Sequence, residues 1–244
     1  MLEAANIIIL SVCVFASHGP YAVKSQARFD QFKVLRVNIP DEKTAQHIFH
    51  AGLKENFKIL AEPRIGYYSD VMVAPDDMKK VIGNLKSMHL NFSVIIENVQ
   101  RVMDLELTPS RAWKKKSNAD HPMTWTEYHS YSDIEAYMDY LVKNYPDFVS
   151  VVHIGTSYEG RPMRVLRICK GGSCGNKPAM WIDGGIHARE WIAPAVATYH
   201  MRELVEKGRN QYLLDKLDWY ILPLHNPDGY QYSRTYDRMW RKNR

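Results

Sequence analysis

A short apolar run that ends in two glycines constrains the fold of this chain most. Ala179–Ile182 is typical of a buried strand, and Gly184 and Gly185 free the backbone for a sharp turn. The apolar stretch Ala193–Val205 then predicts a helix. Strand, tight turn and helix in this order indicate an α/β domain, which places its chemistry at the carboxyl ends of its strands.

Two potential metal ligands follow the glycines. His187 and Glu190 stand three residues apart, so an imidazole and a carboxylate can converge on one ion. Zinc accepts both ligand types at about 2 Å. The bare spacing His-x-x-Glu is also common among ordinary surface residues, so the prediction of a metal site depends on the flanking residues.

Those flanks carry a resemblance. Asp183–Pro194 reads Asp-Gly-Gly-Ile-His-Ala-Arg-Glu-Trp-Ile-Ala-Pro and closely resembles the zinc-binding signature of metallocarboxypeptidases related to pancreatic carboxypeptidases A and B. The resemblance implies that His187 and Glu190 bind one zinc ion, and that Arg189 lines the cleft and contacts the substrate. It implies peptide hydrolysis at the carboxyl terminus of peptides or proteins.

A second stretch near the end of the chain adds to the resemblance. Arg238–Lys242 is similar to the family's Arg-x-Trp-Arg-Lys sequence, in which Arg241 would bind substrate and polarise the scissile carbonyl. The simpler interpretation is a solvated basic tail. Ile154–Pro162 and Asn226–Tyr230 also resemble family stretches, so the likeness runs from about Thr124 to Arg244.

Two functional residues of the family have no counterpart in this sequence. A second histidine ligand and a carboxylate base are expected from later positions, and we expect the sequence to be truncated within the catalytic domain and inactive alone. His225 could be nominated as a replacement ligand, although the family does not use that position, and His200 is too remote on its helix. The alternative function is an inactive product whose pro-domain binds and inhibits a carboxypeptidase. An unrelated zinc-ligand pair in a deacylase-like fold is a third interpretation.

Residues 20–110 predict a separate domain. Alternating strands and amphipathic helices follow the order β-α-β-β-α-β, which is the split ferredoxin-like arrangement. The segment resembles the activation segment of the same carboxypeptidases in order and position. The full prediction is an α+β ferredoxin-like propeptide domain, followed by the first part of an α/β domain, residues 124–244, with a mixed, mostly parallel central sheet.

A basic linker, residues 111–123, separates the two predicted domains. It contains Arg111 and the run Lys114–Lys116, and adjacent like charges keep a chain solvated. We expect a trypsin-like protease to cut after Arg111 or one of these lysines, because exposed linkers are where nicking concentrates. A merely soluble linker is the alternative.

The amino end predicts secretion. The apolar run Ile7–Ala16 is too short to span a bilayer and is typical of a signal peptide, which we place at residues 1–19. A buried element is the alternative. Cys169 and Cys174 form a disulfide in an oxidising compartment or remain reduced thiols. The net charge of +5 is mild, and no basic helix carries the aromatic residues that nucleic-acid binding uses. We expect neither a nucleic-acid partner nor a membrane anchor.

Overall fold

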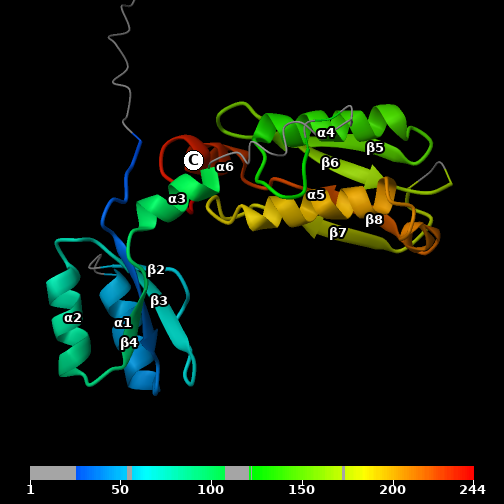
Figure 1. The fold of residues 1–244 in the computed structure, drawn as a ribbon. Helices are drawn as coiled ribbons and strands as arrows, with labels where there is room; N and C mark the ends of the chain where they lie inside the picture. The colour runs from blue at the N-terminus through cyan, green and yellow to red at the C-terminus, as the bar shows by residue number, and fades with distance from the viewer. Residues whose placement is uncertain (1–25, 54–56, 108–120, 122, 172–173) are drawn as a thin grey trace, which may run out of the picture.

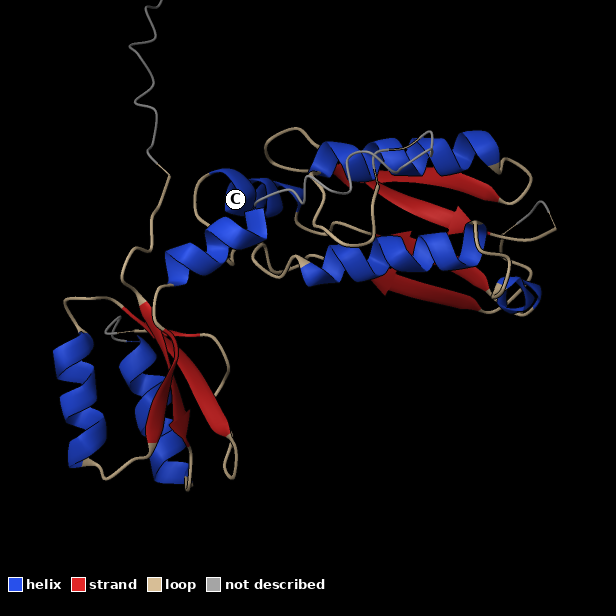
Figure 2. Cartoon of the chain, viewed as in Figure 1, coloured by secondary structure: helices blue, strands red, loops and turns tan. Residues whose placement is uncertain are grey.

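The computed structural model describes residues 26–53, 57–107, 121, 123–171 and 174–244. The predicted signal peptide and the predicted cleavage positions Arg111 and Lys114–Lys116 lie outside these residues, so both remain predictions. Two sheets with their own helices make up the described chain, as Figure 1 and Figure 2 show.

The amino-terminal sheet has the predicted ferredoxin-like arrangement. Its elements are β1 (Lys33–Asn38), α1 (Glu42–Leu53), β2 (Lys58–Ile59), β3 (Tyr68–Val73), α2 (Met78–Ser87) and β4 (Phe92–Ile96). The strand order is β2-β3-β1-β4, and all three pairings are antiparallel. Alternate residues of β1 point to the core, where Leu35 and Val37 are fully buried against Ile48 of α1.

The helix α3 (Val99–Leu107) leads out of this sheet towards the second one. Its buried residues Val99 and Met103 pack with Phe29 in a second small core, and Met239 from the end of the chain packs against that core. The two halves of the chain are therefore in contact through α3.

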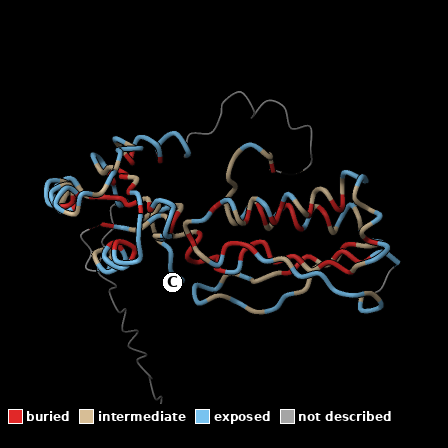
Figure 3. Tube along the Cα trace, turned by 90° about the horizontal axis from the view of Figure 1, so that it is seen from below, coloured by how far each residue is buried: buried red, intermediate tan, exposed pale blue. Residues whose placement is uncertain are grey.

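The second half holds a four-stranded sheet with helices beside it. Its elements are α4 (Tyr131–Asn144), β5 (Val149–Thr156), β6 (Pro162–Ile168), β7 (Ala179–Asp183), α5 (Ile192–Val205), the 3-10 helix η1 (Gln211–Asp215), β8 (Asp218–Leu222) and α6 (Pro227–Thr235). Figure 3 shows buried positions along the sheet and the helix sides next to it. The core joins Tyr137 and Leu141 of α4, Met201 of α5, and Leu166 and Ile221 of the central strands.

The sheet order is β5-β6-β8-β7, and the sheet is mixed, as predicted. Only the β7–β8 pairing is parallel among the described strands, whereas β5–β6 and β6–β8 are antiparallel. This part of the sheet is therefore less parallel than the mostly parallel sheet that we predicted. The short connection Ser157–Arg161 accounts for the β5–β6 pairing, because parallel neighbours need a much longer crossover. Cys169 and Cys174 form a disulfide, which decides between the two alternatives.

Candidate functional site

The turn between β7 and α5 carries the predicted metal ligands. Gly185 adopts a φ of +68°, a left-handed conformation that L side chains rarely adopt. A Cβ on Gly184 would come within 2.8 Å of the carbonyl oxygen of Ala193. The two glycines therefore let the turn lie directly against the first turn of α5, which fixes the position of the residues that follow.

Three predicted site residues meet beyond this turn. Nδ1 of His187 lies 3.2 Å from both carboxylate oxygens of Glu190. Nη2 of Arg241 lies 3.3 Å from the same Nδ1 atom, although 54 residues separate the two side chains in the sequence. His187 is partly exposed, and Glu190 and Arg241 are exposed, so the group is open to solvent.

The pair His187 and Glu190 fits a zinc ion. Two ligands that bind one ion at about 2.0–2.1 Å in a tetrahedral arrangement lie about 3.3 Å apart. The observed separation of 3.2 Å between the imidazole nitrogen and the carboxylate oxygens matches that spacing. An imidazole and a carboxylate are also the donor types that zinc accepts.

No third ligand joins the pair within the part of the chain that the structure describes, where no group of three or more His, Cys, Asp or Glu side chains could hold a metal. His225, considered as a replacement, directs Nδ1 towards Asp183 at 3.4 Å. His200 pairs its Nδ1 with the carbonyl oxygen of Val196 on its own helix. A catalytic zinc has three protein ligands, and His187 and Glu190 are two candidates for them among the described residues.

The helix α6 packs against the turn between β7 and α5. The indole nitrogen of Trp191 donates to Oγ of Ser233 at 2.8 Å, and that hydroxyl lies 2.9 Å from the carbonyl oxygen of Ala188. Trp191 and Ser233 are both 2% exposed. These buried hydrogen bonds hold the turn against α6.

Positive charge gathers beside the two ligands. Burial, together with the nearby charge of Arg241, lowers the pKa of the Arg189 guanidinium. Arg238 lies with its guanidinium 3.7 Å from the ring centroid of Trp191 and donates to the carbonyl oxygen of Arg189 at 2.7 Å. This surface favours anionic or electron-rich groups of a bound molecule.

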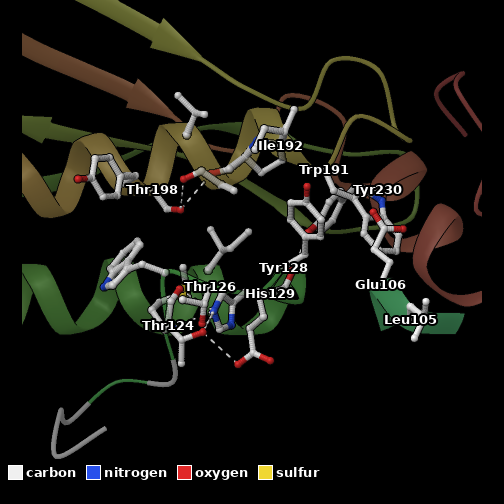
Figure 4. A pocket seen from close by; sticks show the side chains of 18 residues that line it. Leu105, Glu106, Thr124, Thr126, Tyr128, His129, Trp191, Ile192, Thr198 and Tyr230 are labelled. Carbon is white, nitrogen blue, oxygen red and sulfur yellow. Dashed lines mark hydrogen bonds between the residues drawn. The ribbon is translucent and has the colours of Figure 1, made fainter. Parts of the chain in front are cut away.

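A cavity of about 550 Å³ lies next to this region, and Figure 4 shows its lining. Leu105 and Glu106 of α3 lie at one end, close to Trp191 and Tyr230, and Thr198 of α5 lines another part. His187, Glu190 and Arg241 do not line it. The cavity is therefore separate from the three converging side chains.

Sequence reasoning missed the contributions of α6 and of Arg238. The signal for α6 is Asn226–Pro227, because asparagine is a preferred N-cap and proline is favoured at the first helical position. The sequence places Arg238 at the start of the family-like stretch Arg238–Lys242 and assigns it no role of its own. No sequence spacing indicates its contacts with Arg189 and Trp191.

Two family models match the chain in succession. Residues 35–106 match the carboxypeptidase activation peptide, and residues 134–244 match the zinc carboxypeptidases. The two matched segments correspond to the two halves of the described structure.

Similar proteins agree with these matches. Zinc carboxypeptidase A 1 of Anopheles gambiae is 32% identical over 222 residues, which cover 89% of this chain and 50% of that protein. Carboxypeptidase B of Astacus astacus is 49% identical over 123 residues, 50% of this chain and 40% of that protein. The crystal structure of carboxypeptidase A from Helicoverpa armigera has a TM-score of 0.80 and 29% identity over 88% of this chain and 53% of that one. The chain spans about half the length of the curated relatives that it matches.

Proposed function

Because the chain belongs to the zinc carboxypeptidase family, we propose that it serves in a zymogen that removes carboxyl-terminal residues from peptides. The observation that carries this proposal is the convergence of His187, Glu190 and Arg241 within 3.3 Å at the carboxyl end of β7. A metal-ligand pair beside a guanidinium suits hydrolysis of an amide bond, in which negative charge develops on the carbonyl oxygen.

The roles of the residues follow from their chemistry. His187 and Glu190 would hold the zinc ion, which when bound would polarise the scissile carbonyl and lower the pKa of a water molecule. Arg241 donates hydrogen bonds to the carbonyl oxygen as its charge grows, an effect of about 3–4 kcal/mol for comparable donors. Arg189 would contact the peptide at a position remote from the bond that is cut.

Hydrolysis also needs a third ligand and a general base. His187 and Glu190 are the two proposed ligands, and among the residues that the structure describes no third His, Cys, Asp or Glu joins them. We therefore expect the chain by itself to bind zinc weakly and to hydrolyse peptides slowly or not at all.

Activation and secretion are part of the same proposal. The match of residues 35–106 to the activation peptide supports removal of this segment by proteolysis, and we place the cut after Arg111 or one of Lys114–Lys116. A trypsin-like enzyme would make it. Residues 1–19 would direct secretion as a signal peptide. Among the described helices, none has both the length and the apolar character that crossing a bilayer requires.

A second candidate function is inhibition of another carboxypeptidase by the pro-domain. The observation that favours it is that this domain packs around its own core, with Leu35, Val37 and Val73 fully buried. If it acts in trans, the purified chain slows an active carboxypeptidase in proportion to its concentration. Full activity in the presence of excess chain excludes this function.

A chimera tests the main proposal. Residues 134–244 would replace the matching segment of Astacus astacus carboxypeptidase B, which supplies the rest of a catalytic domain. We expect the chimera to release carboxyl-terminal residues, His187→Ala to abolish this activity, and Arg241→Ala to lower kcat about 100- to 1000-fold. Equal activity of the chimera and its His187→Ala variant would refute the proposal.

A further inference from the structure

Asn226 is a buried polar residue just before α6. It is 7% exposed, and its Oδ1 accepts from the backbone N–H of Gly229 at 2.9 Å, which makes it the N-cap of the helix. Capping uses only the oxygen of the side chain. The amide nitrogen of the same side chain carries two N–H donors, which are free to bind elsewhere.

That nitrogen joins two segments that carry site residues. Nδ2 donates to the carbonyl oxygen of Ile186 at 3.3 Å and to that of Lys242 at 3.1 Å. Ile186 directly precedes His187, and Lys242 directly follows Arg241. One side chain therefore bridges the segment of the metal ligands and the segment of the guanidinium.

Backbone hydrogen bonds continue the same connection. The N–H of Asn226 donates to the carbonyl oxygen of Gly185 at 3.2 Å, and the N–H of Ala188 donates to that of Arg241 at 3.1 Å. Because the second bond crosses directly between the two segments, a shift of either would stretch it. Asn226 lies where both segments and α6 meet.

We propose that Asn226 is a positioning residue that sets where Arg241 lies relative to His187 and Glu190. The catalytic meaning of this inference rests on the proposed function. Asn226 itself does not reach the metal ligands; it acts through the two carbonyl groups that it binds. Only an amide can accept from Gly229 and donate to both carbonyl groups, since an aspartate would direct an oxygen at them.

The close packing around Gly229 also supports the inference. A Cβ at this position would come within 2.6 Å of the carbonyl oxygen of Lys242 and would also collide with the side chain of Asn226. The end of the chain therefore lies against the first turn of α6 so closely that only glycine fits. Gly229→Ala should therefore displace both the Arg241 segment and the side chain of Asn226, and so disturb the same bridge without changing Asn226 itself.

Amide hydrogen exchange of the 244-residue chain, without metal, tests the proposal. Asn226→Ser keeps a good N-cap but cannot bridge the two carbonyl groups. We expect the Ala188 amide to exchange about ten-fold faster in Asn226→Ser, which corresponds to about 1.4 kcal/mol. The amides of Tyr230 in α6 and those of β8 should keep their wild-type protection, whereas a general loss of stability would accelerate them as well.

Gly229→Ala should give the same selective acceleration at Ala188. Unchanged exchange at Ala188 in both variants would overturn the proposal, and so would a uniform acceleration that includes β8. Because this measurement uses neither metal nor substrate, its result is independent of the chimera experiment. A chimera without activity together with a selective effect at Ala188 would refute the proposed function and leave the positioning contact in place.

Discussion

An ion pair between Glu106 and Arg238 joins the activation segment to the candidate site. Nε and Nη2 of Arg238 donate to the two carboxylate oxygens of Glu106 at 2.6 and 2.8 Å. Glu106 belongs to α3, the last helix before the predicted linker, and Arg238 also binds the carbonyl oxygen of Arg189. We predict that Glu106→Gln weakens the attachment of the activation segment after the linker has been cut.

The magnitude follows from the geometry and the burial. The side chain of Arg238 is 15% exposed and that of Glu106 is 26% exposed, and the two are joined by a pair of hydrogen bonds. A fully exposed ion pair contributes about 0–1 kcal/mol, and a hydrogen bond to a charged group about 1.5–3 kcal/mol. We therefore expect a loss of about 2 kcal/mol, which corresponds to about 30-fold weaker association. The glutamine keeps the size of the side chain, so little of this loss comes from packing.

The assay begins with a single tryptic cut between α3 and Met123 of the full chain. The dissociation constant of the activation segment is then measured by surface plasmon resonance. Glu97→Gln is the matched control, because the same substitution removes a pair with Lys33 in which the glutamate is 71% exposed. If Glu106→Gln weakens association no more than Glu97→Gln does, the reasoning is wrong.

Two further predictions concern stability and association. Asp228 is 2% exposed and accepts from Oγ of Ser157 at 2.7 Å and from the N–H of Glu159 at 2.9 Å. Asp228→Asn should therefore lower the free energy of unfolding in urea by about 2 kcal/mol. Burial opposes ionisation of Asp228, but these bonds and Arg161 outweigh it and lower its pKa, so the difference is full above about pH 4 and lost as pH falls through the folded-state pKa. An undiminished difference at pH 2 contradicts this origin. Trp181 is 51% exposed on β7, the strand at one edge of the described sheet, and an exposed edge strand promotes association between chains. Trp181→Lys should therefore raise the monomer fraction in sedimentation. A lysine at Tyr212, which is exposed but lies outside the sheet, should leave that fraction unchanged.

Most of the fold was predictable because local patterns specify it. The alternation in β1 and the apolar faces of α1 and α2 predict the β-α-β-β-α-β order, which is confirmed. The sequence does not predict the helix α6, because its mean hydropathy is low and the residues Pro227-Asp228-Gly229 at its start are typical of a turn. Its start signal at Asn226–Pro227 was nevertheless present in the sequence. Tertiary contacts, not an apolar stripe, stabilise this helix.

The candidate site was predictable only in part. His187 and Glu190 are neighbours on one turn, so their spacing alone places them together. Arg241 is 54 residues away from His187, and its role came from resemblance, because no local pattern reports such a contact. The Glu106–Arg238 pair spans 132 residues and joins the two halves of the described chain. Long-range contacts of this kind depend on how the elements pack, which periodicity does not encode.

Metal binding by the 244-residue chain tests the central claim most directly. The change in unfolding temperature with added zinc would be measured for the wild type, for His187→Ala and for His200→Ala. Even a weak ligand stabilises the folded state once its concentration exceeds the dissociation constant, so zinc in such excess should raise the unfolding temperature of the wild type and of His200→Ala, but not that of His187→Ala. An equal increase in all three proteins would contradict a site built on His187 and Glu190.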